Sequence, residues 1–125
     1  MAMEKILIIE DNEFNREIAE TTLKKQGYDV ITAVDGKEGL EKISQKPDLI
    51  LLDLSLPKVS GWEIVKKVRE DEEIRTVPIL ALTAHAMVGD REKAMRMGCS
   101  AYLSKPCLPS ELVKEVESIL NEYKE

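Results

Sequence analysis

The feature that most constrains the fold is a short apolar run that ends in a carboxylate. Residues 48–53 read DLILLD, so Leu49 to Leu52 lead directly into Asp53. The run has no polar alternation, which is typical of a strand covered on both faces, as in the middle of a parallel sheet. Leucine runs also suit helices, but this run is short and Pro57 follows soon afterwards. We therefore interpret it as a buried strand with Asp53 at its carboxyl end.

The rest of the chain alternates strand-like and helix-like segments. Further strands are predicted at residues 5–9, 29–34, 77–82 and 101–104. Helices are predicted at about 13–26, 36–46, 61–73, 88–97 and from 109 onwards, with glycine caps at Gly27 and Gly98. In the first helix, Phe14, Ile18 and Leu23 are expected to face inward. The pattern predicts one α/β domain over residues 1–125, a doubly wound five-stranded parallel sheet with helices on both faces.

Composition excludes several classes of protein. The 125 residues include 18 basic and 24 acidic side chains, giving a formal net charge of −6. This balance disfavours direct binding to nucleic acid or to an anionic membrane and favours a cation as ligand. No apolar run approaches the ~20 residues that span a membrane, so we expect a cytoplasmic protein. The two cysteines, Cys99 and Cys107, lack metal-ligand spacing and are expected to be free thiols.

Polar residues follow four of the predicted strands. They are Glu10 and Asp11, Asp53, Thr83, and Lys105. A parallel sheet brings the carboxyl ends of its strands to one edge, where ligands bind in open α/β folds. At ~5 Å separation and an effective dielectric of ~20, each pair of carboxylates repels by about 3 kcal/mol, or roughly 10 kcal/mol for three. A divalent ion removes this repulsion, and oxygen ligands with waters suit Mg²⁺.

These residues also have simpler interpretations. Any one of the acids could be a helix cap or a solvated loop end, Thr83 a turn residue and Lys105 a surface cation. Their joint occurrence at four strand ends favours a site. A carboxylate beside Mg²⁺ can attack phosphorus and form an aspartyl phosphate, so Asp53 is the candidate nucleophile. Lys105 and the Thr83 hydroxyl are then expected to compensate charge on the phosphoryl oxygens.

The chain as a whole resembles a receiver domain of a two-component response regulator. The resemblance rests on Glu10-Asp11, Asp53 with Pro57 and Gly61, Thr83-Ala84 and Lys105-Pro106. It implies a flavodoxin-like receiver fold with strand order 2-1-3-4-5. It also implies that Asp53 accepts a phosphoryl group from a histidine kinase or phosphotransfer protein. The DNEFNR and LTAHAM stretches are similar to those of hybrid-kinase receivers and phosphorelay shuttles.

The resemblance further implies roles for individual residues. Asp11, Asp53 and the backbone carbonyl of Ser55 would hold Mg²⁺, with Glu10 acting largely through water. Thr83 and Tyr102 would be a switch pair that changes the face of the fourth helix, fifth strand and fifth helix, where a downstream protein binds. Such a domain is not a turnover enzyme, and at most it loses its own phosphoryl group slowly.

Two residues beside the site are candidates for tuning the lifetime of the phosphoryl group. Ser55 lies two residues after Asp53, and His85 lies two after Thr83. The imidazole of His85, with an ordinary pKa of ~6.5, could change charge close to neutral pH and so make the lifetime depend on pH. An exposed loop histidine with no such role is the alternative interpretation.

Other classes share parts of this pattern. A flavin binder of the flavodoxin type needs a donor-rich loop after the first strand, where this chain has EDNEFN. A haloacid-dehalogenase-like phosphatase needs a second aspartate two residues after the first, where this chain has Ser55. A pseudo-receiver that binds a partner without phosphorylation is the remaining alternative, and Asp53, Thr83 and Lys105 argue against it.

Overall fold

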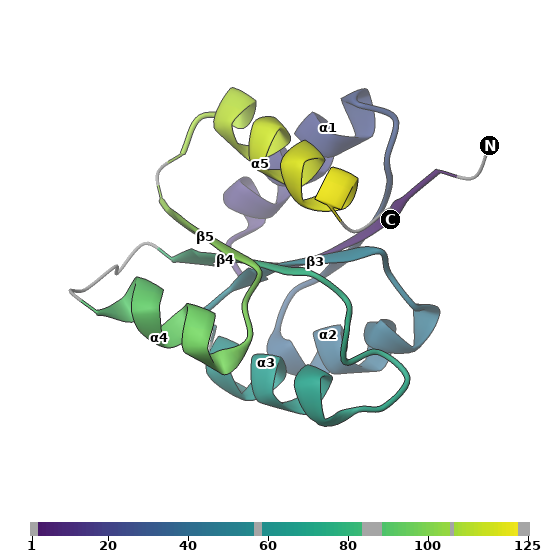
Figure 1. The fold of residues 1–125 in the computed structure, drawn as a ribbon. Coiled ribbons are helices and arrows are strands. Elements are labelled where there is room, and N and C mark those ends of the chain that lie inside the picture. The colour runs from purple at the N-terminus through teal and green to yellow at the C-terminus, as the bar shows by residue number, and fades with distance from the viewer. Residues whose placement is uncertain (1–2, 57–58, 84–88, 106, 123–125) are drawn as a thin grey trace.

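Five parallel strands form one sheet in the order β2-β1-β3-β4-β5 in the computed structural model, which describes residues 3–56, 59–83, 89–105 and 107–122 (Figure 1). The strands are β1 (Lys5–Ile9), β2 (Asp29–Ala33), β3 (Leu49–Asp53), β4 (Ile79–Thr83) and β5 (Ala101–Ser104). The predicted fold class and strand order are confirmed. The strand boundaries differ from the prediction by one residue in β2 and by up to two in β4.

Helices cover both faces of the sheet (Figure 1). One face carries α1 (Glu13–Lys25) and α5 (Pro109–Glu122), and the other carries α2 (Gly36–Lys42), α3 (Gly61–Glu70) and α4 (Asp90–Met97). A short 3-10 turn, Ile43–Gln45, follows α2. Polar caps begin three of these helices, since the side chains of Asn12, Asp35 and Ser60 each accept a hydrogen bond from a first-turn N–H. Among the described residues, none of the helices has the length and apolar character needed to cross a membrane.

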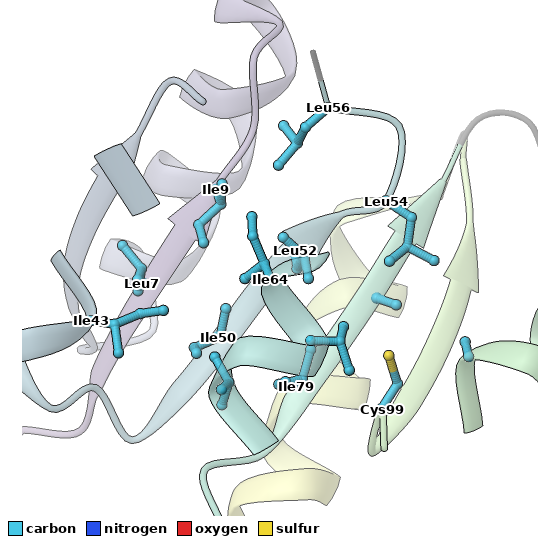
Figure 2. Packing of buried hydrophobic residues seen from close by; sticks show 14 of the residues in the cluster. Leu7, Ile9, Ile43, Ile50, Leu52, Leu54, Leu56, Ile64, Ile79 and Cys99 are labelled. Carbon is cyan, nitrogen blue, oxygen red and sulfur yellow. The ribbon is translucent and has the colours of Figure 1, made fainter. Parts of the chain in front are cut away.

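The central strand separates two apolar layers. Leu49 and Leu51 pack with the α1 and α5 side, whereas Ile50 and Leu52 pack with the α2, α3 and α4 side. Figure 2 shows the second layer, in which Ile50 and Leu52 lie near Ile64 of α3. All five residues of β3 are buried. Burying a leucine or isoleucine side chain stabilises a fold by about 1.5–3 kcal/mol, so β3 is firmly held from both sides.

The predicted inward face of α1 is partly wrong. Leu23 is fully buried and Ala19 is buried, but Phe14 is 70% exposed and Ile18 is 40% exposed. The reason is helical geometry: Phe14 and Leu23 are nine positions apart, about two and a half turns at ~3.6 residues per turn, and therefore point in opposite directions. The first turn of α1 thus presents an aromatic side chain to solvent.

Gly61 allows α3 to begin directly against the end of the central strand. A Cβ atom at this position would lie 2.5 Å from the Cα of Leu54 and 2.7 Å from the backbone oxygen of Asp53. Both neighbours are backbone atoms, which cannot rotate away. The missing side chain therefore sets how closely α3 approaches the residues that follow β3.

We predict that Gly61→Ala destabilises the fold by roughly 1–3 kcal/mol, because overpacking forces the backbone apart. Urea unfolding followed by circular dichroism measures this. Lys66→Ala, on the exposed face of the same helix, is the matched control and should change stability by less than about 0.5 kcal/mol. Equal stability of Gly61→Ala and the unmodified protein would contradict the proposed role of this close approach.

Candidate functional site

The carboxyl ends of the strands bring the predicted residues together. Glu10 follows β1, Asp53 and Thr83 end β3 and β4, and Lys105 follows β5. The parallel register pairs Ile9 with Leu52 and Asp53 with Leu82, so these ends lie side by side. Glu10, Asp53 and Thr83 are only 4%, 6% and 4% exposed. Three polar side chains are therefore buried together at one edge of the sheet.

Lys105 bridges two of the buried carboxylates. Its Nζ lies 3.1 Å from Oδ2 of Asp53 and also donates a hydrogen bond to Oε1 of Glu10. The other oxygen of Glu10, Oε2, accepts a hydrogen bond from the backbone N–H of Asn12 at 3.2 Å. One cation thus compensates two acids, and both oxygens of Glu10 have protein partners.

Burial and charge shift the pKa values in this cluster. Burial raises the pKa of Glu10, outweighing the hydrogen bond from Lys105 that lowers it, and the nearby charge of Asp53 adds to the rise. For Lys105, burial alone would lower the pKa, but the hydrogen bond that it donates to Glu10 and the charge of Asp53 raise it overall. Lys105 therefore stays an ammonium ion, and the Glu10 carboxyl group loses its proton at a higher pH than it would in water.

The donor set fits a hard divalent cation. Glu10, Asp11 and Asp53 each offer a carboxylate oxygen, and the three oxygens lie within 4.8 Å of one another. Asp11 is exposed, which leaves the cluster accessible from solvent. Three carboxylates face one ammonium group, so the cluster carries excess negative charge. Oxygen-only ligands with an open, solvated side suit Mg²⁺, which keeps several of its waters when it binds.

Ser55 connects Asp53 to Thr83. Its backbone N–H donates a 2.8 Å hydrogen bond to Oδ1 of Asp53, and its Oγ lies 3.1 Å from Oγ1 of Thr83, where either hydroxyl can donate. The sequence predicted that Ser55 lies beside the site but did not predict its side-chain contact with Thr83. No sequence signal indicates this contact, because it depends on how the β3 and β4 ends are juxtaposed.

Tyr102 lies behind the site on β5. It pairs with Ala81 in the sheet register and is 8% exposed, so the ring is packed into the layer on the α4 side. Burial raises the pKa of its phenol, and the charge of Asp90 in α4 adds to the rise. Within the described part of the chain, the Tyr102 hydroxyl has no hydrogen-bond partner. The ring is inward, next to the start of α4.

A cavity of about 500 Å³ opens beside Asp53, between α1 and α5. Its lining is mostly apolar and includes Phe14, Ile18 and Leu108. Leu108 is 64% exposed, so all three form part of the surface. The place of Phe14 and Ile18 in this lining was not predicted from the sequence. The nine-residue separation of Phe14 from Leu23 was the available signal, since it places the aromatic ring opposite the core.

The structure therefore brings together most of the predicted site residues: Glu10, Asp11, Asp53, Ser55, Thr83 and Lys105. Tyr102 lies on β5, which neighbours the strand that ends in Thr83. His85, Pro57 and Pro106 lie outside the described residues, and the predicted effect of His85 on phosphoryl lifetime stays a prediction.

Comparison with known proteins places this arrangement among signalling domains. The sequence matches the response regulator receiver domain over residues 6–117. It is 39% identical, over 118 residues, to the polar-differentiation response regulator DivK of Brucella anthropi. That alignment covers 94% of this chain and 96% of the relative.

Solved structures agree with the sequence match. The chemotaxis response regulator CheY4 of Vibrio cholerae superposes with a TM-score of 0.88 at 33% identity, covering 94% of this chain and 99% of that one. The receiver domain of the sensor histidine kinase PA1611 of Pseudomonas aeruginosa has a TM-score of 0.87 at 36% identity, covering 96% and 99%. That relative was solved with a magnesium ion coordinated in its active site cleft.

The raised pKa of Glu10 predicts how stability depends on pH without metal. The folded state holds this proton more tightly than the unfolded state, whose ordinary pKa is 4.5. The free energy of unfolding contributed by Glu10 therefore falls as pH rises from about that value through the raised one, and then levels off. Glu10→Gln, which cannot lose a proton, should lack this fall.

Urea unfolding in chelator-treated buffer at a series of pH values measures this effect as the difference between the two proteins. Glu17→Gln, an exposed acid on α1, is the control and should follow the unmodified protein. A constant difference between the Glu10→Gln and unmodified curves across this range would show that the pKa of Glu10 is the same in the folded and unfolded states.

Proposed function

This chain belongs to the response regulator receiver domain family, and on that premise we propose that it is a phosphoacceptor switch that receives a phosphoryl group on Asp53. The observation that carries the proposal is the cluster at the end of β3, where the Asp53 carboxylate lies 3.1 Å from Lys105 Nζ. The donor is a phosphohistidine on a kinase or phosphotransfer protein. An Asp53 oxygen attacks phosphorus, a P–O bond forms, and the P–N bond breaks with its electron pair leaving on the imidazole.

The neighbours of Asp53 have complementary roles in this transfer. Phosphoryl transfer is catalysed mainly by positioning and charge compensation. Lys105 already contacts Asp53 Oδ2, and its ammonium group would compensate the negative charge of the transferred phosphoryl group. The Ser55 N–H orients the other oxygen, Oδ1. Thr83, buried at the end of the adjacent strand, supplies a hydroxyl for a phosphoryl oxygen. Burial of Asp53 limits access of water to the acyl phosphate.

Asp11, Asp53 and the backbone carbonyl of Ser55 are the proposed Mg²⁺ ligands, with Glu10 acting through water. The two protein hydrogen bonds of Glu10 support its indirect role, since both of its oxygens are already engaged. When bound, Mg²⁺ would neutralise the excess negative charge of the carboxylates and of the incoming phosphoryl group. The resulting aspartyl phosphate is a signalling state, lost at most by slow autodephosphorylation, so the domain is not a turnover enzyme.

The donor protein is proposed to dock over the cavity between α1 and α5. Phe14, Ile18 and Leu108 give this rim an exposed apolar surface, and the cavity lining continues to Asp53 and Lys105. An amphipathic helix that carries the phosphohistidine can bury its apolar face there while presenting its imidazole to Asp53. Leu108 lines the same cavity as Phe14, which supports a place for it on the donor side.

The output is proposed to be a change in the face formed by α4, β5 and α5, through Thr83 and Tyr102. Tyr102 is packed beside α4, and Met95 of α4 is 44% exposed and available to a downstream protein. Lys93 of α4 lies 4.3 Å from the ring centroid of Trp62 in α3, so a movement of α4 alters the surroundings of Trp62. We further propose that residues 1–125 act as a single receiver domain in the cytoplasm, without direct binding of nucleic acid or membrane. A pseudo-receiver without phosphorylation is the alternative.

We expect Asp53→Asn to abolish labelling by a small phosphodonor such as acetyl phosphate, because the amide is not a nucleophile. Intact mass spectrometry with Mg²⁺ should show one added phosphoryl group on the unmodified protein and none on the mutant or in chelator. Asp48→Asn, at the residue just before the opposite end of the same strand, is the matched control and should label normally. Labelling of Asp53→Asn to the same extent would reject Asp53 as the acceptor.

Trp62 offers a direct report of the output step, because it is the single tryptophan in the chain. Beryllium fluoride with Mg²⁺, a phosphoryl mimic, should change its fluorescence by moving Lys93 relative to the indole ring. Lys93→Met removes the cation–π contact, worth about 0.5–1 kcal/mol at an exposed site, and should reduce this change. An unchanged spectrum, with the mimic shown to be bound, would mean that α4 does not move relative to α3.

A further inference from the structure

Arg16 of α1 reaches back to the loop that carries two of the clustered acids. Its Nη1 donates a hydrogen bond to the backbone oxygen of Glu10 at 3.0 Å and a longer one to the backbone oxygen of Asp11 at 3.5 Å. Both carbonyl groups lie between the end of β1 and the start of α1, and Arg16 is half-buried. One side chain therefore holds two consecutive backbone groups of this loop.

The helix itself does not account for the position of the Arg16 guanidinium group. Arg16 is the fourth residue of α1, and the helix dipole disfavours a positive charge near a helix N-terminus. Among the residues that the structure describes, Arg16 forms no ion pair with an acidic side chain. The carbonyl groups of Glu10 and Asp11 are the hydrogen-bond partners that the structure gives it.

The backbone of the loop decides where the Asp11 carboxylate lies. The two oxygens of Glu10 are held by Lys105 and by the backbone N–H of Asn12, and the Asn12 side chain caps α1. Asp11 is exposed, and within the described part of the chain its carboxylate has no hydrogen bond or ion pair. Its oxygens nevertheless lie in the cluster with Glu10 and Asp53. The contact of Arg16 with the Asp11 carbonyl is therefore a side-chain contact that bears directly on this position.

We propose that Arg16 is a positioning residue of the metal site, which fixes the loop backbone so that Asp11 and Asp53 favour Mg²⁺ over Ca²⁺. This inference rests on the proposed Mg²⁺ site and adds an ion preference to it. Arg16 acts through the loop and does not itself contact the ion. The partners that orient ligands from behind a metal site typically change its affinity by roughly 10- to 100-fold when removed.

The preference follows from the different demands of the two ions. Mg²⁺ requires near-ideal octahedral geometry with bonds of about 2.0–2.1 Å, whereas Ca²⁺ accepts variable geometry at about 2.3–2.6 Å. A loop that is held in one place suits the stricter ion, and a loosened loop penalises it more. A simple charge effect has the opposite sign, because removing a positive group near a cation site strengthens the binding of both ions.

Three variants separate position from charge. Arg16→Met removes the hydrogen bonds and the charge. Arg16→Lys keeps the charge but loses the planar guanidinium group that can reach two carbonyls. Lys25→Met removes one positive charge from the exposed last residue of α1 and is the matched control. Isothermal titration calorimetry with Mg²⁺ alone and with Ca²⁺ alone measures the affinities, and urea unfolding measures the stability of each variant.

We expect Arg16→Met to bind Mg²⁺ roughly 10-fold more weakly and to lose less affinity for Ca²⁺, so that its preference for Mg²⁺ falls. Arg16→Lys should change in the same direction by a smaller factor, and Lys25→Met should match the unmodified protein. Unchanged or tighter binding of both ions by Arg16→Met would overturn the proposal, as would equal weakening for both ions. Arg16→Lys keeps the test decisive if Arg16→Met is unstable: affinities equal to those of the unmodified protein would show that only the charge matters.

The outcome is distinguishable from a failure of the proposed function. If the unmodified protein binds no Mg²⁺, the proposed metal site is wrong and this inference falls with it. If it binds Mg²⁺ and the Arg16 variants bind both ions as the unmodified protein does, only the role of Arg16 is wrong. Labelling with acetyl phosphate at saturating Mg²⁺ provides the second readout, because Arg16→Met should then still gain one phosphoryl group. Loss of labelling under that condition would contradict a role confined to metal affinity.

Discussion

The ionic contact of Lys105 with Glu10 and Asp53 holds the functional edge of this sheet together. Two carboxylates are buried at the ends of neighbouring strands, where their ionised forms repel each other and lack water. Lys105 reaches both of them from the end of β5, across β4. Removing one member of a buried ionic cluster leaves an uncompensated charge, which typically costs about 3–5 kcal/mol. The site is thus both a stabilising contact and a local excess of negative charge that a divalent cation can relieve.

The scaffold positions this chemistry by holding the backbone at the end of β3 between packed layers. β3 is buried on both faces, and the start of α3 lies against the backbone of Leu54 because Gly61 has no side chain. The residues around Asp53 are less constrained, since Ser55 and Asp11 are exposed. A firmly held carboxylate surrounded by accessible groups suits the role of phosphoacceptor that we propose for Asp53.

Much of the site could be predicted from the sequence, and the failures have a common cause. In a parallel sheet, the carboxyl ends of all strands lie at one edge. The strand pattern alone was therefore sufficient to predict that four residues meet there: Glu10, Asp53, Thr83 and Lys105. The inward face of α1 was misjudged because Phe14 and Ile18 were grouped with Leu23 by hydrophobicity and not by angle. The same angular separation around α1 places Phe14 and Ile18 on the exposed rim beside Asp53, and this consequence was overlooked.

By itself, the sequence determined which residues end each strand and hence which chemical groups meet, because strand periodicity and chain order are local properties. It also determined the acidic balance of the chain. Tertiary structure alone decided that Lys105 contacts two carboxylates at once, that Ser55 and Thr83 share a hydrogen bond, and that Tyr102 is inward. These features join residues far apart in the chain, and their geometry depends on the register and packing of neighbouring strands, which no local pattern encodes.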